Sequence, residues 1–188
     1  KFTLIVRTEH REFLERIKLP ERTQIIETET TTEGPLSSVL LARSYLEKDE
    51  PLLVANVDQY VDISIEDFYQ ACGRDASDGV IMLFGDPDRN PKWSFAEIRD
   101  DQIVRVAEKE PISDYATVGI YYFDNPSVFL SAADRMVSDN KRVNGEFYVC
   151  PVYNYLIDEF DQRIHGYLIE KEEMKGLGTP EDLREFIR

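Results

Sequence analysis

Short apolar runs alternate with helical patterns in the first half of the chain, and this alternation constrains the fold more than any other feature. Mostly apolar runs at residues 2–6, 52–57 and 79–84 predict buried strands. Between them, apolar spacing predicts a helix at residues 36–40, and residues 65–72 predict another. Because strand and helix alternate, we expect right-handed crossovers and an α/β fold with a mainly parallel sheet covered by helices on both faces.

The pattern changes in the second half of the chain. Residues 93–109 alternate polar and apolar side chains on either side of Asp100-Asp101, which predicts a β-hairpin. Residues 116–123 predict a further strand, and the apolar spacing within residues 128–136 predicts an amphipathic helix. A hairpin is therefore expected beside the mainly parallel strands.

Composition limits the classes of protein that the chain can belong to. Its 188 residues suffice to bury one core, and no linker or repeat divides them, so we expect a single domain over residues 1–188. The net charge of −15 argues against nucleic acid or an anionic membrane as partner. No apolar run is long enough for a membrane span. Cys72 and Cys150 have no metal-ligand spacing, which favours free thiols and a cytoplasmic protein.

A carboxylate between two amides follows the predicted strand at residues 52–57. Asn56, Asp58 and Gln59 stand where the apolar run ends. In open α/β sheets, ligands bind beyond the carboxyl ends of the strands. Mg2+ is commonly held by one or two carboxylates together with substrate phosphates. Asp58 is therefore a candidate metal ligand, and the alternative is that its side chain caps the following turn.

Four further residues have both a chemical and a structural interpretation. Lys109 is suited to bind a phosphate and Glu108 to accept from sugar hydroxyls, although such a pair is also common at a solvated strand end. Gly119, inside a predicted strand, marks the close approach of a ligand or of another part of the chain. Glu146 precedes a predicted helix and is either a binding residue or a capping or surface acid.

Six stretches of the chain are informative together: TEGPLSSVLLA, EPLLVANVDQYVD, PKWSFAEI, VAEKEPISDYATVGIYYF, RVNGEFYVCPVYN and GLGTPEDL. Taken in order, they resemble the sugar-1-phosphate nucleotidyltransferases, also called nucleotide-sugar pyrophosphorylases. The resemblance is closest to the capsule and surface-polysaccharide branch, and it runs from about residue 30 to the end of the chain. It implies a Rossmann-like three-layer α/β/α fold of the glycosyltransferase-A type.

The resemblance assigns roles to individual residues. Gly34 corresponds to the loop that meets the nucleotide base, and Asp58 to the family's Mg2+ ligand. Lys109 corresponds to the lysine that contacts the sugar phosphate, and Gly119 and Glu146 to residues that contact the sugar. The predicted catalytic residues are Asp58 and Lys109, and the predicted substrate-binding residues are Gly34, Glu108, Gly119 and Glu146.

The chain departs from the family pattern at three places. Glu110 separates Lys109 from the proline of the family's Glu-Lys-Pro motif. Gly176 stands where the family has an Asp as second metal ligand. The Gly-rich loop that grips the triphosphate has no counterpart in the sequence. We therefore expect an N-terminally truncated chain that is inactive by itself and comes from an active parent protein.

The resemblance implies a function for that parent protein. It would transfer a nucleotidyl group from a nucleoside triphosphate to a sugar 1-phosphate or a similar phosphorylated acceptor, with Mg2+ as cofactor. Pyrophosphate would be released, and the product would serve polysaccharide precursor synthesis. The base, the acceptor and the oligomeric state, including a homo-oligomer, stay open.

Two alternatives belong to other classes. A non-catalytic relative that binds a nucleotide or a sugar is favoured by Gly176. A glycosyltransferase that uses a nucleotide sugar would need an Asp-x-Asp motif, which the stretch NVDQYVD lacks. If the predicted residues serve one ligand, we expect Asp58, Lys109, Gly119 and Glu146 around one concave surface.

Overall fold

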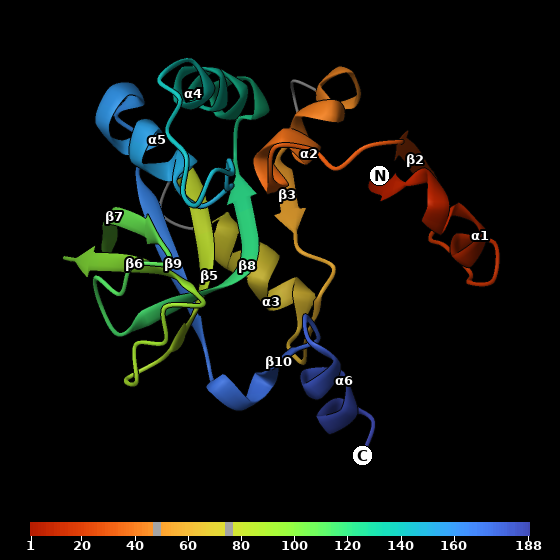
Figure 1. Cartoon of the computed structure of the whole chain (residues 1–188). Helices are drawn as coiled ribbons and strands as arrows, with labels where there is room; N and C mark the ends of the chain where they lie inside the picture. Colours follow the sequence, from red (N-terminus) through yellow and green to blue (C-terminus); the bar gives the residue numbers. More distant parts are fainter. Residues whose placement is uncertain (47–49, 74–76) are drawn as a thin grey trace.

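The computed structural model describes residues 1–46, 50–73 and 77–188. Its centre is a six-stranded mixed sheet with the order β7-β6-β8-β5-β9, in which β3 also pairs with β8 (Figure 1). The α/β fold class with a central mixed sheet is thereby confirmed. The strands of this sheet are β3 (Leu52–Ala55), β5 (Gly79–Gly85), β6 (Ser94–Arg99), β7 (Gln102–Glu108), β8 (Tyr115–Phe123) and β9 (Ile164–Ile169).

The expectation of a mainly parallel sheet is wrong. In the six-stranded sheet, as far as the structure describes it, β5 and β9 form the parallel pair, and the other pairs are antiparallel. The reason lies in β8, which is inserted between β3 and β5 and runs against both. The alternation of strand and helix indicated the common direction of β3 and β5 but not the strand placed between them.

Helices cover both faces of the sheet. On one face, α4 (Pro126–Ser138) and α5 (Val152–Phe160) pack with α2 (Pro35–Leu41) in one apolar core, and on the other face α3 (Ile65–Cys72) contributes to a second core. The strand β5 serves both cores, because Ile81 and Leu83 belong to the first, while its Val80, Met82 and Phe84 belong to the second. This burial on both faces explains the unbroken apolar run at residues 79–84.

Local signals in the sequence predict several elements correctly. The hairpin of β6 and β7 turns at Asp100 and Asp101, which have positive φ angles of 48° and 63°. The helix α6 (Pro180–Phe186) begins with Pro180 after the cap Thr179, whose side chain accepts a hydrogen bond from the backbone of Asp182. No helix in the described residues is long and apolar enough to cross a membrane.

Two small sheets lie outside the central one. The parallel pair β1 (Phe2–Arg7) and β2 (Thr23–Thr28) forms a small sheet of its own, and the short helix α1 (Arg11–Leu14) lies between its two strands in sequence (Figure 1). The second small sheet is the antiparallel pair of β4 (Gln59–Val61) and β10 (Met174–Gly176). In sequence, β4 follows β3, and β10 precedes α6. Short 3-10 turns at Thr8–His10, Arg43–Tyr45 and Lys171–Glu173 complete the described elements.

Candidate functional site

Lys109 and Glu146 meet at the hydroxyl group of Tyr148. The Lys109 ammonium donates a hydrogen bond of 2.5 Å to Tyr148 Oη and lies 4.7 Å from the centre of its ring. Tyr148 in turn donates a hydrogen bond of 2.6 Å to Glu146 Oε2. The structure therefore brings together the two residues that the sequence assigns to one sugar phosphate.

The protonation states favour this arrangement. The hydrogen bond to Tyr148, with smaller contributions from Glu108 and Glu146, raises the pKa of Lys109, so this side chain is a cation at neutral pH. Burial and the hydrogen bond to Glu146 raise the pKa of Tyr148, so its phenol keeps the proton that it donates. The result is a cation and a carboxylate held apart by a neutral hydroxyl group.

Glu146 is presented by a tight turn. Val143 and Glu146 exchange two backbone hydrogen bonds of 3.0 Å, and Asn144 and Gly145 between them have φ angles of 49° and 86°. Two successive positive φ angles are typical of a type I′ turn, for which Asn-Gly is the preferred pair. The Glu146 side chain is exposed, so it is available to a ligand.

Glu108 is the last residue of β7 and lies close to Lys109 and Glu146. Its carboxylate accepts a hydrogen bond from the Ser94 hydroxyl group. Burial raises the pKa of Glu108, and the charge of Glu146 raises it further. The hydrogen bond from Ser94 and the charge of Lys109 lower this pKa, but by less than burial raises it. Glu108 is thus a partly buried carboxyl group that protonates more readily than a free one.

Gly34 lies directly against the segment that carries Glu146. Its φ angle is 120°, and a Cβ atom there would be 2.6 Å from the carbonyl oxygen and 2.7 Å from the nitrogen of Phe147. Two backbone hydrogen bonds flank this contact, from Leu36 to Phe147 at 2.9 Å and from Phe147 to Glu33 at 2.8 Å. Close backbone contact therefore requires glycine here, and contact with a nucleotide base stays a prediction.

Gly119 has a structural explanation as well. With φ at 89°, a Cβ atom at this position would lie 2.6 Å from Asn56 Nδ2 and 3.0 Å from Gln59 Oε1. The backbone of Asn56 also donates a hydrogen bond of 3.0 Å to the Gly119 carbonyl oxygen. Packing against another part of the chain is thus sufficient to explain this glycine, and contact with a sugar stays a prediction.

Asp58 stands at the carboxyl end of β3 with an exposed side chain. Its carbonyl oxygen accepts a hydrogen bond of 2.6 Å from Leu177, and Gly178 would place a Cβ atom 3.2 Å from Asp58 Oδ2. Gly176 pairs with Gln59, one residue away. Within residues 1–46, 50–73 and 77–188, the Asp58 carboxylate forms no hydrogen bond or ion pair, which gives no support to the capping alternative.

The Asp58 carboxylate by itself fits only a metal ion that a bound ligand also coordinates. The described part of the chain contains no group of three or more His, Cys, Asp or Glu residues that could hold a metal ion. Mg2+ keeps several waters and takes one or two carboxylates plus substrate phosphates. Asp58 therefore fits Mg2+ bound together with a triphosphate, and not a metal ion enclosed by protein.

Comparison with known proteins decides the family. The sequence model described as Nucleotidyl transferase matches residues 2–183. The chain belongs to the nucleotidyl transferase family. No curated protein matches the chain in sequence.

Two of the many solved structures that resemble this nucleotidyl transferase chain are a pyrophosphorylase and a CTP transferase. The crystal structure of the nucleoside-diphosphate-sugar pyrophosphorylase from Vibrio cholerae RC9 has a TM-score of 0.83 and 29% identity, over 100% of this chain and 80% of the other. The inositol-1-phosphate CTP transferase from T. maritima has a TM-score of 0.74 and 16% identity, over 99% of this chain and 73% of the other. The second likeness shows the shared fold alone.

Sequence reasoning missed two residues of the candidate site, Tyr148 and Trp93. Tyr148 stands two residues after Glu146, and this spacing in an extended segment is the signal that could have placed both side chains on one side. Trp93 accepts a hydrogen bond of 3.0 Å from the backbone of Lys109, and its ring would lie 4.0 Å from a Cβ atom at Gly176. Trp93 thus connects the Lys109 part of the site with the strand β10 beside Asp58.

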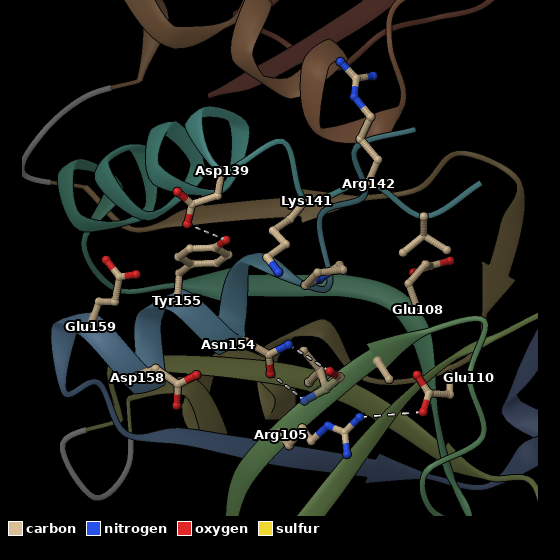
Figure 2. Close-up of a pocket in the computed structure, with 14 residues that line it drawn as sticks. Arg105, Glu108, Glu110, Asp139, Lys141, Arg142, Asn154, Tyr155, Asp158 and Glu159 are labelled. Atoms are coloured by element: carbon tan, nitrogen blue, oxygen red, sulfur yellow. Dashed lines mark hydrogen bonds and ion pairs between the residues drawn. The ribbon is translucent and has the colours of Figure 1, made fainter. Parts of the chain in front are cut away.

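A cavity of about 480 Å3 lies next to this site, between β7, α5 and residues 139–143 (Figure 2). Its lining includes Glu108 but not Asp58, Lys109, Gly119 or Glu146, so the expected single concave surface does not coincide with this cavity. Most of its charged groups have partners: Arg105 lies 3.7 Å from Glu110, and Tyr155 donates a hydrogen bond of 3.1 Å to Asp139. Its five acids, against three cations, disfavour an anionic ligand. The acids are Glu108, Glu110, Asp139, Asp158 and Glu159, and the cations are Arg105, Lys141 and Arg142.

Proposed function

We propose that the protein transfers a nucleotidyl group from a nucleoside triphosphate to a sugar 1-phosphate or a similar phosphorylated acceptor. Pyrophosphate is the second product, and the sugar nucleotide serves as a polysaccharide precursor. The observation that carries this proposal is the contact of Lys109 and Glu146 through one hydroxyl group, that of Tyr148. A cation for a phosphate beside a carboxylate for sugar hydroxyls is the pair of groups that a sugar phosphate needs.

The proposed reaction is an in-line displacement at phosphorus. A phosphate oxygen of the acceptor attacks the α-phosphorus of the triphosphate and forms a new P–O bond. The bond from the α-phosphorus to its bridging oxygen breaks, and pyrophosphate leaves with the electron pair. A dianionic phosphate has no proton to lose, so catalysis consists of positioning and charge neutralisation.

The residues of the site divide this work. Lys109 neutralises and positions the acceptor phosphate, and its raised pKa keeps it charged over the physiological range. Glu146 and Glu108 accept hydrogen bonds from the sugar, while Tyr148 fixes the distance between Lys109 and Glu146. Asp58 would hold Mg2+, which when bound lowers the negative charge of the triphosphate.

The test is release of pyrophosphate by the full-length protein. Each nucleoside triphosphate is combined with a panel of sugar 1-phosphates in the presence of Mg2+, and kcat/KM is measured for the acceptor. Loss of a charge-assisted hydrogen bond of about 1.5–3 kcal/mol predicts that Lys109→Met lowers this value roughly tenfold to a hundredfold. Lys18→Met, which removes an exposed lysine elsewhere, is the matched control and should have no effect. Equal activity of the two variants would contradict the role of Lys109.

A binding protein without catalysis is the second candidate, because Gly176 removes a carboxylate and the described residues contain no group of three or more His, Cys, Asp or Glu residues that could hold a metal ion. The chain has one tryptophan, Trp93, whose backbone contacts that of Lys109. Its fluorescence therefore reports ligand binding without turnover. A saturable change of fluorescence with sugar phosphate, together with no pyrophosphate release in any combination, would favour this candidate.

A further inference from the structure

Arg142 joins two segments that are distant in sequence. Its guanidinium group lies 3.9 Å from the ring centre of Phe147, and it donates a hydrogen bond of 3.0 Å to the Gly145 carbonyl oxygen. It also forms an ion pair of 3.1 Å with Glu33, and its Nε donates to Asn140 Oδ1 at 2.7 Å. One side chain therefore contacts both the turn that carries Glu146 and the loop that precedes Gly34.

The contacts of Arg142 differ in strength. Glu33 is 68% exposed, so its ion pair with Arg142 is well solvated and contributes little. The Phe147 ring is only 1% exposed, and the guanidinium group over its face is part of its cover. Stacking of a cation on a desolvated ring is the stronger interaction. The planar head group of arginine stacks on this ring and at the same time donates hydrogen bonds to Gly145 and Asn140, which an ammonium group of the same charge does not reproduce.

The stacked ring lies between the two predicted binding segments. Phe147 donates its backbone hydrogen bond to Glu33 and accepts one from Leu36, so the loop at Gly34 is attached to the Glu146 turn at this residue. Tyr148, the next residue, contacts Lys109. A displacement of Phe147 would therefore shift both the Gly34 loop and the Tyr148 hydroxyl group.

We propose that Arg142 is a positioning residue that clamps the Gly34 loop to the Glu146 turn through Phe147. The clamp makes the part of the site assigned to the nucleotide and the part assigned to the acceptor one mechanical unit. The roles of these two parts rest on the proposed function, whereas the clamp itself does not. Arg142 touches neither ligand in this proposal and acts through Phe147 and Tyr148.

Hydrogen exchange tests the clamp without any ligand. The amides of Leu36 and Phe147 report on the attachment, and the amide of Ile81 in the buried strand β5 reports on global unfolding. Arg142→Gln should accelerate exchange at Leu36 and Phe147 by about tenfold or more and leave Ile81 unchanged, because only a local opening becomes easier. Arg99→Gln, at an exposed arginine paired with Glu97, is the matched control and should change none of them.

A lysine variant separates shape from charge. Arg142→Lys keeps the charge but loses the planar head group and its fixed donors, so it should behave like Arg142→Gln. Wild-type exchange rates at Leu36 and Phe147 in Arg142→Lys would overturn the stacking argument. Unchanged exchange at Leu36 and Phe147 in Arg142→Gln, or equal acceleration at Ile81, would overturn the clamp.

Kinetics on the full-length protein then connect the clamp with the site. Arg142→Gln should raise KM for triphosphate and for sugar phosphate together by about tenfold with a much smaller change of kcat, because a loosened unit binds both ligands less well. A change in one KM alone would refute the coupling of the two parts. Absence of turnover in the wild type would refute the proposed function, and the exchange experiment would still decide on the clamp.

Discussion

Replacement of Gly34 by alanine tests how the loop is held against the Glu146 turn. Two separate effects oppose a side chain here. The φ angle of 120° with ψ at 175° belongs to a region that residues other than glycine rarely enter, and a Cβ atom would meet the Phe147 backbone at 2.6 Å. The backbone strain corresponds to roughly 1–3 kcal/mol. The close contact adds the loss of the two flanking hydrogen bonds, at about 1 kcal/mol each, because the two segments must separate to make room for the methyl group.

The expected loss for Gly34→Ala is therefore about 3–5 kcal/mol, which corresponds to a decrease of Tm by roughly 6–20 °C for a chain of this size. Urea unfolding and thermal unfolding measure it. Two glycines serve as matched controls. Gly145 also has a positive φ angle, 86°, but no atom within 4 Å of its Cβ position, so Gly145→Ala should lose only about 1 kcal/mol.

The second control is a glycine at which a side chain would meet neither backbone strain nor a close contact. Gly85 has no atom within 4 Å of its Cβ position and no unusual φ angle, so Gly85→Ala should stay within about 0.5 kcal/mol of the wild type. If Gly34→Ala and Gly145→Ala lose equal stability, the contact with Phe147 contributes nothing and the reasoning is refuted. A graded series of the three variants would support it.

Three further predictions concern single carboxylates. Asp86 is buried and its partner Lys171, at 3.1 Å, is half-exposed, so Lys171→Met should lower the free energy of unfolding by about 1–3 kcal/mol, and urea unfolding that shows no loss would contradict this. Burial raises the pKa of Glu108 above its ordinary 4.5, so the folded protein binds this proton more tightly than the unfolded chain does. The resulting contribution to the free energy of unfolding is complete below pH 4.5 and is lost as the pH rises through the folded-state pKa. Glu108→Gln should flatten this part of the stability curve, and an unchanged curve would speak against the shift. Asp58→Asn should lower Mg2+-dependent turnover by about tenfold or more without loss of stability, and a destabilised but fully active variant would contradict its role.

Sequence reasoning named the residues of the candidate site as predictions but not the contacts that hold them. Lys109, Glu146 and Gly34 were assigned from their motifs, and in the structure Glu146 lies against Gly34 and is connected with Lys109 through Tyr148. Tyr148, which connects Lys109 with Glu146, was missed, because a tyrosine in an extended apolar segment is equally consistent with the core. Gly119 was expected to mark either a ligand or packing, and only the structure shows the packing, against Asn56 and Gln59.

The sequence by itself determined those features that depend on neighbours a few residues away. The turn at Asp100-Asp101, the cap at Thr179 and the apolar run of β5 follow from backbone preferences and side-chain spacing within short segments. The α/β class follows from the order of such segments.

Only the tertiary structure decided which segments become neighbours. The insertion of β8 between β3 and β5, the attachment of Phe147 to the loop at Gly34 and the ion pair of Arg142 with Glu33 all join residues far apart in the chain. Such contacts depend on the shape of the complete core and on loop closure, to which no local pattern is sensitive. A mainly parallel sheet was expected for this reason, since spacing along the chain carries no record of the strand that packs between two others.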